Sequence, residues 1–238
     1  VLLRPLPFHS PDRLALVWTD DVKRGVRERE TSYLTFADWR QQSRRFSDMA
    51  IFQGEPVIVK GPNGTERVLA EIVSANVFSL LGAKPIAGRV FSTDEEERAE
   101  PVVVISHSMW QRQFGGSPEA IGATITVTGG RVSDQRSRIL GVMPREFYFP
   151  SKDVQLWRPT LSGFVSGRGA RWRTEPRYRF VLNDWSVIGR LQPDATVEQA
   201  RDEMTAIGRH LGTLHAGEAV KAAGFAGFAV NVVPLRDQ

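Results

Sequence analysis

Between residues 82 and 150 the chain reads, in order, Gly82-Ala-Lys-Pro-Ile-Ala-Gly-Arg-Val-Phe91, Val102-Val-Val-Ile-Ser-His-Ser-Met-Trp-Gln-Arg-Gln-Phe-Gly-Gly116, Ile121-Gly-Ala-Thr-Ile-Thr-Val127 and Ile139-Leu-Gly-Val-Met-Pro144. Glycines, aromatic residues and β-branched residues dominate these segments. Such residues shape and pack short strands and turns. The stretch therefore predicts a strand-rich module that works by binding or coupling rather than by catalysis.

The bulk composition is that of a folded protein with a sizeable core. The chain has 238 residues, of which 41% are hydrophobic, and this is enough for one large domain or two smaller ones. It contains no cysteine, which excludes disulfides and cysteine metal sites but excludes no compartment. The formal net charge is only +4, with 31 basic and 27 acidic residues, and indicates a well-solvated surface rather than a nucleic-acid or membrane ligand.

Neither a membrane span nor a secretory signal is predicted from the sequence. The most apolar candidate, residues 219–233, contains Lys221 and Asn231 and falls short of the roughly 20 apolar residues that cross a bilayer. A basic start followed by an apolar stretch, which is typical of secretory signals, is not found. Because the chain begins at Val1 without a methionine and reads to Gln238 without an evident end, we expect it to be a segment of a longer protein.

Periodicity predicts a β-α-β unit at each end of the chain. Thr35 opens the first helix with the pattern of a capping box, and Thr196 with Gln199 opens the second helix, which Gly212 ends. The predicted strand, helix and strand are residues 12–19, 35–46 and 49–60 in the first unit, and 185–191, 196–211 and 228–233 in the second.

The region between these units consists of shorter predicted elements and differs in composition. Ser106 and Gly115 bound a short helix after the buried strand 102–105. The acidic run Thr93–Glu97 is expected to be a solvated loop or helical turn. Residues 161–180, rich in glycine and arginine and without a period, are expected to form an exposed loop. The predicted fold class is α+β, with two β-α-β units from both chain ends and a strand-rich insertion.

Ser106, His107 and Ser108 have the composition of a nucleophile with a base. Adjacent residues on a helix point apart, so neighbours in sequence are poorly placed to form a Ser–His pair. The segment also lacks the Gly-x-Ser-x-Gly pattern of a nucleophile elbow. A helix cap at Ser106 is the favoured interpretation. A small serine hydrolase that uses Ser106 or Ser108 with a distant acid is kept as an alternative function.

No metal, cofactor or nucleotide site is predicted. His210 and His215 are five residues apart, which does not place them on one helix face as a spacing of four does. The consecutive carboxylates Glu95–Glu97 are interpreted as solvated rather than as cation ligands. The glycines between residues 163 and 169 lack the strand-to-helix context of a phosphate loop. We therefore expect no catalytic residue, no metal and no cofactor.

Arginines gather with aromatic residues in the loop 161–180. Such sets bind phosphate backbones and bases, form interface hot spots or contact lipid head groups. A nucleic-acid-binding module is thus a second alternative function, and a loop without a specific ligand stays open beside it. The candidate partner-contact residues are Arg168, Arg171, Trp172, Arg173, Arg177 and Tyr178.

A series of motifs covers most of the chain in order. They are Leu2-Leu-Arg-Pro-Leu-Pro-Phe8, Pro11-Asp-Arg-Leu14, Ser32-Tyr-Leu-Thr-Phe-Ala-Asp-Trp-Arg40, Val73-Ser-Ala-Asn-Val-Phe-Ser-Leu-Leu-Gly82, Gly88-Arg-Val-Phe91, Ser106-His-Ser-Met-Trp-Gln-Arg112, Phe114-Gly-Gly116, Gly141-Val-Met-Pro144, Val187-Ile-Gly-Arg-Leu-Gln-Pro193, Thr196-Val-Glu-Gln-Ala200 and Val232-Val-Pro-Leu-Arg-Asp-Gln238. In this series the chain resembles MacB/FtsX-like ABC transporter permeases, in particular the acidobacterial-type predicted permeases. It departs from the family at Pro193-Asp-Ala195, where Pro-Gly-Val is usual, and in residues 162–180, which look longer and more basic.

That resemblance implies the extracytoplasmic core domain between the first two membrane helices of such a permease, on the periplasmic or outer side of a bacterial inner membrane. The family's domain has a porter-like subdomain built from both ends of the segment and a sabre-like subdomain inserted between them. We expect the first part of the porter-like subdomain at 1–80, the sabre-like subdomain with the basic loop at 81–182, and the second porter-like part at 183–238.

The same resemblance implies a non-catalytic role. The domain would couple the motion of the membrane helices to the handling of a substrate or partner outside the membrane. The implied partners are the flanking transmembrane helices of the full-length permease, a second permease copy, a cytoplasmic ATPase and a periplasmic adaptor protein. No nucleic acid is expected among them.

Overall fold

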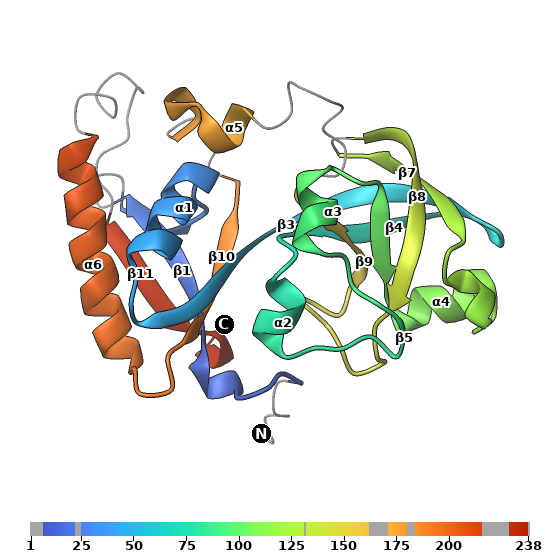
Figure 1. The fold of residues 1–238 in the computed structure, drawn as a ribbon, viewed down its shortest axis with the longest axis horizontal. Helices are drawn as coiled ribbons and strands as arrows, with labels where there is room; N and C mark the ends of the chain where they lie inside the picture. The colour runs from blue at the N-terminus through green and yellow to red at the C-terminus, as the bar shows by residue number, and fades with distance from the viewer. Residues whose placement is uncertain are drawn as a thin grey trace. The chain divides into compact units, whose positions relative to one another are not determined.

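The structure, a computed structural model, describes residues 7–21, 25–130, 132–161, 171–179, 184–215 and 229–237. The fold class is α+β, as predicted, and the chain forms two compact units (Figure 1). The terminal unit is Ser10–Ile51 together with Ala170–Gln238, and the inserted unit is Phe52–Gly169 together with Pro7–His9. Within the described ranges, no helix is both long enough and apolar enough to span a bilayer.

The terminal unit contains an antiparallel sheet around β1. Its strand order is β11-β1-β10-β3, and β2 pairs with the far end of β1. Both predicted β-α-β units are present, but each is split, because β10 lies between β1 and β3 while β1 lies between β10 and β11. The elements are η1 (Pro11–Arg13), β1 (Leu14–Asp21), β2 (Val26–Arg29), α1 (Tyr33–Gln42), the first part of β3 (Phe46–Gly61), α5 (Arg171–Thr174), η3 (Pro176–Arg179), β10 (Ser186–Leu191), α6 (Val197–Leu214), β11 (Ala229–Pro234) and η4 (Leu235–Asp237).

The observed ends of α1 and α6 can be compared with the capping residues predicted from the sequence. Helix α6 begins with the predicted capping box of Thr196 and Gln199, and its buried side packs against β11 (Figure 1). Helix α1 begins earlier than predicted, because the Thr35 N–H donates to Ser32 Oγ (3.2 Å) and Ser32 is therefore the cap. Helix α6 also continues through Gly212, since one glycine inside a long helix costs only about 1 kcal/mol.

The inserted unit is a closed ring of six strands. β3 pairs with β4, β4 with β9, β9 with β6, β6 with β8, β8 with β7, and β7 pairs again with β3. The ring is therefore a small barrel. Strand β5 pairs with the end of β8 and is not part of the ring. The elements besides β3 are β4 (Gly64–Val73), α2 (Val77–Leu81), β5 (Ala87–Gly88), α3 (Thr93–Glu97), β6 (Val102–Ile105), α4 (His107–Phe114), η2 (Pro118–Ala120), β7 (Thr124–Gly129), β8 (Val132–Val142) and β9 (Val154–Pro159).

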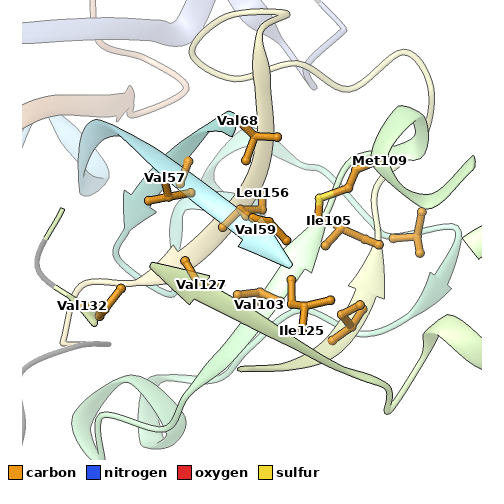
Figure 2. Close-up of a cluster of buried hydrophobic side chains, with 13 residues drawn as sticks. Val57, Val59, Val68, Val103, Ile105, Met109, Ile125, Val127, Val132 and Leu156 are labelled. Carbon is orange, nitrogen blue, oxygen red and sulfur yellow. The ribbon is translucent and has the colours of Figure 1, made fainter. Parts of the chain in front are cut away.

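All six strands point small and medium apolar side chains into the barrel. Figure 2 shows these side chains converging, with Met109 from α4 among them. Each buried valine, leucine or isoleucine contributes about 1.5–3 kcal/mol through removal of its surface from water. The buried cluster consists of Val57, Val59, Val68, Ala70, Val103, Ile105, Met109, Ile125, Val127, Val132, Ile139, Val142 and Leu156.

The short strand β5 is held by a close backbone approach. Gly88 has φ +69°, and a Cβ at this position would lie 2.1 Å from the carbonyl oxygen of Leu140 on β8. Only glycine combines this conformation with this spacing. The Arg89 N–H donates to the same Leu140 oxygen at 2.9 Å, so the approach is also hydrogen-bonded.

The division into units differs from the ranges 1–80, 81–182 and 183–238 drawn from the sequence. The inserted unit begins at Phe52 because the second part of β3 pairs with β4 and β7 inside the barrel. The terminal unit resumes at Ala170 because α5 and η3 contact α1. Strand β3 thus contributes to both units without interruption.

Candidate functional site

The predicted Ser106–Ser108 segment lies beside a surface groove of the inserted unit. The groove has a volume of about 400 Å³ and brings together two acidic and two basic side chains. β4, α4 and the start of β9 supply most of it. Its lining residues are Pro56, Glu66, Arg67, Val68, Leu69, Arg112, Asp153 and Gln155.

Gln155 holds the two serine hydroxyls at this groove. Its Oε1 accepts hydrogen bonds from Ser106 Oγ (3.0 Å), Ser108 Oγ (2.8 Å) and Arg112 Nη2 (3.1 Å). Ser106 Oγ also accepts from the N–H of Met109 at 3.0 Å, which makes it the predicted helix cap. An amide oxygen has no useful basicity, so this arrangement does not activate either serine.

His107 packs against Trp110. Its ring meets Trp110 in an edge-on contact, with centroids 5.6 Å apart and an interplanar angle of 81°. In the described part of the chain, the two hydroxyls bond to Gln155, to each other and to a main-chain N–H, and to no ionisable group. The geometry therefore does not favour the serine hydrolase alternative.

The acidic run forms the helical turn α3, as one of the two predicted forms, and Asp94 and Glu97 are exposed, but Glu95 and Glu96 are buried and not solvated as the sequence indicated. Glu95 receives two hydrogen bonds of 2.7 Å from Arg89, and it closes a capping box with Ser92. These contacts, first of all the Arg89 hydrogen bond, lower the pKa of Glu95 to about 2. Glu96 accepts from the N–H of Ala75 (2.7 Å) and from the hydroxyl of Thr160. The sequence missed this because consecutive acidic residues look alike in a pattern, whichever face they occupy.

Metal binding gains no support from the described residues. No cluster of three or more histidine, cysteine, aspartate or glutamate side chains with the geometry to hold a metal ion occurs among them. Both buried carboxylates of α3 are already engaged by protein donors. The predicted glycine-rich stretch 163–169 lies outside the described residues.

The loop 161–180 is partly folded into the terminal unit, which corrects the expectation of an exposed loop. Trp172 is buried, stacks on Trp185 at 5.4 Å and meets Tyr33 edge-on at 5.0 Å. The guanidinium of Arg173 lies over the Tyr33 ring at 4.8 Å. Arg179 is also buried and forms an ion pair with Asp38.

The six candidate contact residues therefore divide into different groups. Trp172 is a core residue, and Arg171 is exposed and paired with Glu175 at 3.3 Å. Arg168 and the side chain of Arg177 lie outside the described residues, and Tyr178 is half-buried on η3. A nucleic-acid site needs exposed rings for stacking, so the burial of Trp172 speaks against that alternative. Contact of the exposed members with a partner stays a prediction.

Three ionisable residues that the sequence analysis did not single out meet in the inserted unit. Arg158 and Glu55 form an ion pair of 2.9 Å, and Glu71 is only 1% exposed. Burial first, and then the charge of Glu55, raises the pKa of Glu71 to about 8. Charged residues at inward positions of alternating strands are a sequence signal that could have found Glu55 and Arg158.

The start of β1 and the end of β11 lie side by side in the terminal unit. Ala15 at the start of β1 is in register with Pro234 at the end of β11. η1 contacts η4, and Arg236 Nη1 lies 3.1 Å from Asp12 Oδ1. The described elements at the two ends of this unit, η1 before β1 and η4 after β11, therefore lie together at one end of the sheet.

Three solved structures have the same fold. The periplasmic region of MacB from Actinobacillus actinomycetemcomitans is 12% identical, with TM-score 0.63 and coverage of 94% of this chain and 90% of that one. The extracellular domain of the noncanonic ABC-type transporter YknZ from Gram-positive bacteria is 11% identical, with TM-score 0.62 and coverage of 92% and 99%. A domain of a putative permease protein from Porphyromonas gingivalis is 15% identical, with TM-score 0.67 and coverage of 98% and 92%.

Sequence comparison assigns the family. No curated protein matches the chain. The family model described as MacB-like periplasmic core domain matches residues 5–207, which is most of the chain. The resemblance found in the motifs, and with it the extracytoplasmic location, is therefore confirmed: this chain belongs to the family of MacB-like periplasmic core domains.

Proposed function

We propose that the chain is the non-catalytic extracytoplasmic domain of an ABC-type permease, and that it couples the motion of flanking membrane helices to the handling of a substrate or partner outside the membrane. Its proposed partners are those flanking helices, a second permease copy, a cytoplasmic ATPase and a periplasmic adaptor protein. In this proposal the terminal unit is the porter-like subdomain, and the inserted unit is the sabre-like subdomain.

The neighbouring positions of β1 and β11 carry this proposal. Register pairs from Ala15↔Pro234 to Asp20↔Ala229 join the two strands over most of their length. A displacement of the segment that follows β11 therefore acts on a hydrogen-bonded strand pair, which moves as one body rather than as two loose ends. A domain tethered at two distant loops would absorb such a displacement in its loops.

Strand β3 supplies the route from the terminal unit into the inserted unit. β1 pairs with β10, β10 pairs with β3, and β3 continues for 16 residues into the barrel. An uninterrupted strand transmits displacement better than a flexible linker does. The absence of activated groups at Ser106 and Ser108 supports a mechanical role over a chemical one.

The proposed location can be tested with a cysteine at an exposed site. The chain has no cysteine of its own, and Glu119 on η2 is exposed. In the full-length protein, with any cysteines outside this chain replaced, Glu119→Cys should react with a membrane-impermeant maleimide added to intact cells. Ile125→Cys, buried in the barrel, is the matched control and should stay unlabelled until the protein is denatured. Labelling of Glu119→Cys only after cell lysis would overturn the location.

The proposed coupling can be tested by pinning the two ends together. Asp12 and Arg236 form a surface ion pair, so Asp12→Cys with Arg236→Cys should accept a short bismaleimide cross-linker. Because β1 and β11 already move as one body in this proposal, we expect the cross-linked full-length transporter, reconstituted with its ATPase, to keep its coupled ATP hydrolysis. Loss of most of that activity on cross-linking would show that the two ends must separate and would contradict the proposal, and either single cysteine variant treated with the same reagent is the control.

A further inference from the structure

The groove beside α4 runs along one edge of strand β4. Four consecutive residues of this strand, 66–69, line the groove. Consecutive side chains of a strand lie on opposite faces of its sheet, so a groove that reaches all four of them must follow the edge of the strand. Strand β3 pairs with β4 over its whole length and occupies the other edge. The groove therefore gives access to main-chain groups of β4 as well as to its side chains.

The main chain at the start of β4 is unpaired on this edge. The register pair Gly61↔Gly64 closes a two-residue turn, and the pair that closes such a turn exchanges hydrogen bonds. Since bonded and unbonded residues alternate along an antiparallel strand, Thr65 and Arg67 direct their N–H and C=O groups away from β3. Strand β9 joins that edge only from Leu69 onward. Among the described residues, the outward main-chain groups of Thr65 and Arg67 thus have no strand partner.

The side chains around the groove are already held in place by their own hydrogen bonds. Nη2 of Arg112 on α4 donates to Glu66 at 3.0 Å and to Gln155 at 3.1 Å. Gln155 in turn accepts from the hydroxyls of Ser106 and Ser108. Side chains fixed in this way do not have to be ordered when a ligand enters, so the entropic cost of binding is reduced. The volume of about 400 Å³ is also within the usual range for ligand sites.

Two charged side chains of the groove have no partner in the described part of the chain. Arg67 and Asp153 are both exposed, and neither side chain is hydrogen-bonded or ion-paired there. The other two charged residues of the groove, Glu66 and Arg112, pair with each other. Opposite charges on neighbouring strands attract, so an arginine beside an open edge favours a carboxylate on a strand that is added there.

We propose that this groove binds an extended peptide segment of another protein, which adds as a short strand to the free edge of β4 and places an acidic side chain beside Arg67. Main-chain hydrogen bonds to Thr65 and Arg67 supply the affinity, and the charge of Arg67 supplies the selectivity. Strand edges that bind nothing are commonly covered, shortened or bulged, whereas this edge is open along a groove. The site goes beyond the proposed coupling function and does not depend on it.

A short probe peptide tests the strand pairing. The probe is the acetylated and amidated pentapeptide Val-Thr-Glu-Thr-Val, whose β-branched residues favour an extended conformation. It is titrated into the 238-residue chain, and the backbone amides are followed by NMR. We expect the amide signals of Thr65 and Arg67 to shift most, because their N–H groups gain acceptors.

Two N-methylated versions of the probe show whether main-chain hydrogen bonds hold it. One is methylated at both threonines, and the other at the glutamate and the last valine, so the two lack donors on opposite edges of the added strand. Only one edge of the probe can pair with β4. One version should therefore bind as the probe does, and the other at least tenfold more weakly.

The preference for an acidic side chain has its own controls. Lysine in place of the probe's glutamate, or Arg67→Gln in the protein, should weaken binding about threefold. Arg136→Gln replaces an exposed arginine on β8 of the same unit, makes the same change in net charge and should bind the probe as the wild type does. An equal loss in both protein variants would overturn the role of Arg67.

Two results would overturn the site itself. They are no shift at Thr65 and Arg67, and equal binding of the two N-methylated probes. Either result would mean that the exposed charges only protect this edge from pairing. The experiment involves neither a membrane nor transport. The coupling function, which is tested by labelling and cross-linking, can therefore fail while the peptide site stands, and the reverse.

Discussion

Nη2 of Arg158 lies 2.9 Å from Oε1 of Glu55, and the side chain of this arginine is only 1% exposed. The two residues come from β9 and β3, which are not neighbours in the ring, since β4 lies between them. The ion pair therefore spans across β4. Removing one partner of such a pair costs about 3–5 kcal/mol, because the other charge is left buried.

Glu71, on the intervening strand, should make the protein less stable as the pH rises. Its pKa is raised from 4.5 to about 8, so the ionised form is disfavoured in the folded state. Its contribution is fully favourable below pH 4.5 and is lost progressively as the pH rises toward 8. Glu71→Gln should therefore gain about 3 kcal/mol at pH 7, measured by urea denaturation, and converge with the wild type near pH 4. Parallel pH profiles for the two proteins would contradict this, and Glu119→Gln, an exposed position, is the control.

Glu95 should have the opposite dependence on pH. Its pKa is lowered to about 2 by the hydrogen bonds of Arg89, so its stabilisation is present above pH 4.5 and is lost as the pH falls toward 2. At pH 7, Glu95→Gln should lose about 2 kcal/mol in the free energy of unfolding. Glu97→Gln, an exposed position on the same helix, should lose less than about 0.5 kcal/mol. If the deficit of Glu95→Gln persisted unchanged to pH 2.5, the ion pair would not be its cause.

Gly88 and Gly115 provide a matched pair for the close approach at β5. Their φ angles are +69° and +60°, so alanine is equally strained at both. A Cβ at Gly88 meets the Leu140 oxygen at 2.1 Å, whereas at Gly115 nothing lies within 4 Å. Gly88→Ala should cost about 3 kcal/mol or more and Gly115→Ala about 1 kcal/mol in thermal or chemical unfolding. Equal losses would show that conformation alone, and not the contact with β8, requires glycine at position 88.

Trp172 should anchor the segment 171–179 to the terminal unit. Replacing it by alanine removes the stack on Trp185 and the contact with Tyr33, which should cost about 3 kcal/mol. Arg171→Ala, the exposed residue beside it, should change stability by less than about 0.5 kcal/mol. Limited trypsin digestion should cut the Trp172→Ala variant faster after Arg173 or Arg179. An unchanged cleavage pattern would mean that the segment is held by other contacts.

Local signals in the sequence predicted local structure well. The Thr196–Gln199 capping box, the cap at Ser106 and the glycine stop at Gly115 all occur as predicted, because each depends on hydrogen bonds within a few residues. The start of α1 was wrong by a few residues because Ser32 and Thr35 both carry a hydroxyl that can cap, and the structure selects the earlier one.

Closure of the barrel could not be predicted from periodicity. Alternation in β3 identifies Val57 and Val59 as inward residues, but it does not say which strand lies beside them. The pair Ile58↔Thr128 closes the ring between segments 70 residues apart, and only tertiary packing determines that register. Alternation also marks Glu55 and Arg158 as inward residues, but it does not identify them as partners of each other.

The segment 171–179 is ordered although its sequence predicts an exposed loop. Its sequence has no period and many arginines, which is typical of exposed loops. Its largest buried side chain, Trp172, packs on residues far away in the chain, and Arg179 pairs with Asp38. Isolated long-range contacts of this kind leave no periodic pattern in the sequence, so composition alone misassigned the segment.

Because β3 gives its first residues to one unit and its last residues to the other, neither unit can lose this strand without fraying the other. Heating should consequently produce a single calorimetric transition, in which both halves melt together instead of in succession. Two units joined by a flexible hinge can unfold independently, whereas two units that share one strand are expected to unfold together. Substitutions that destabilise the barrel should therefore also lower the melting temperature of the terminal unit.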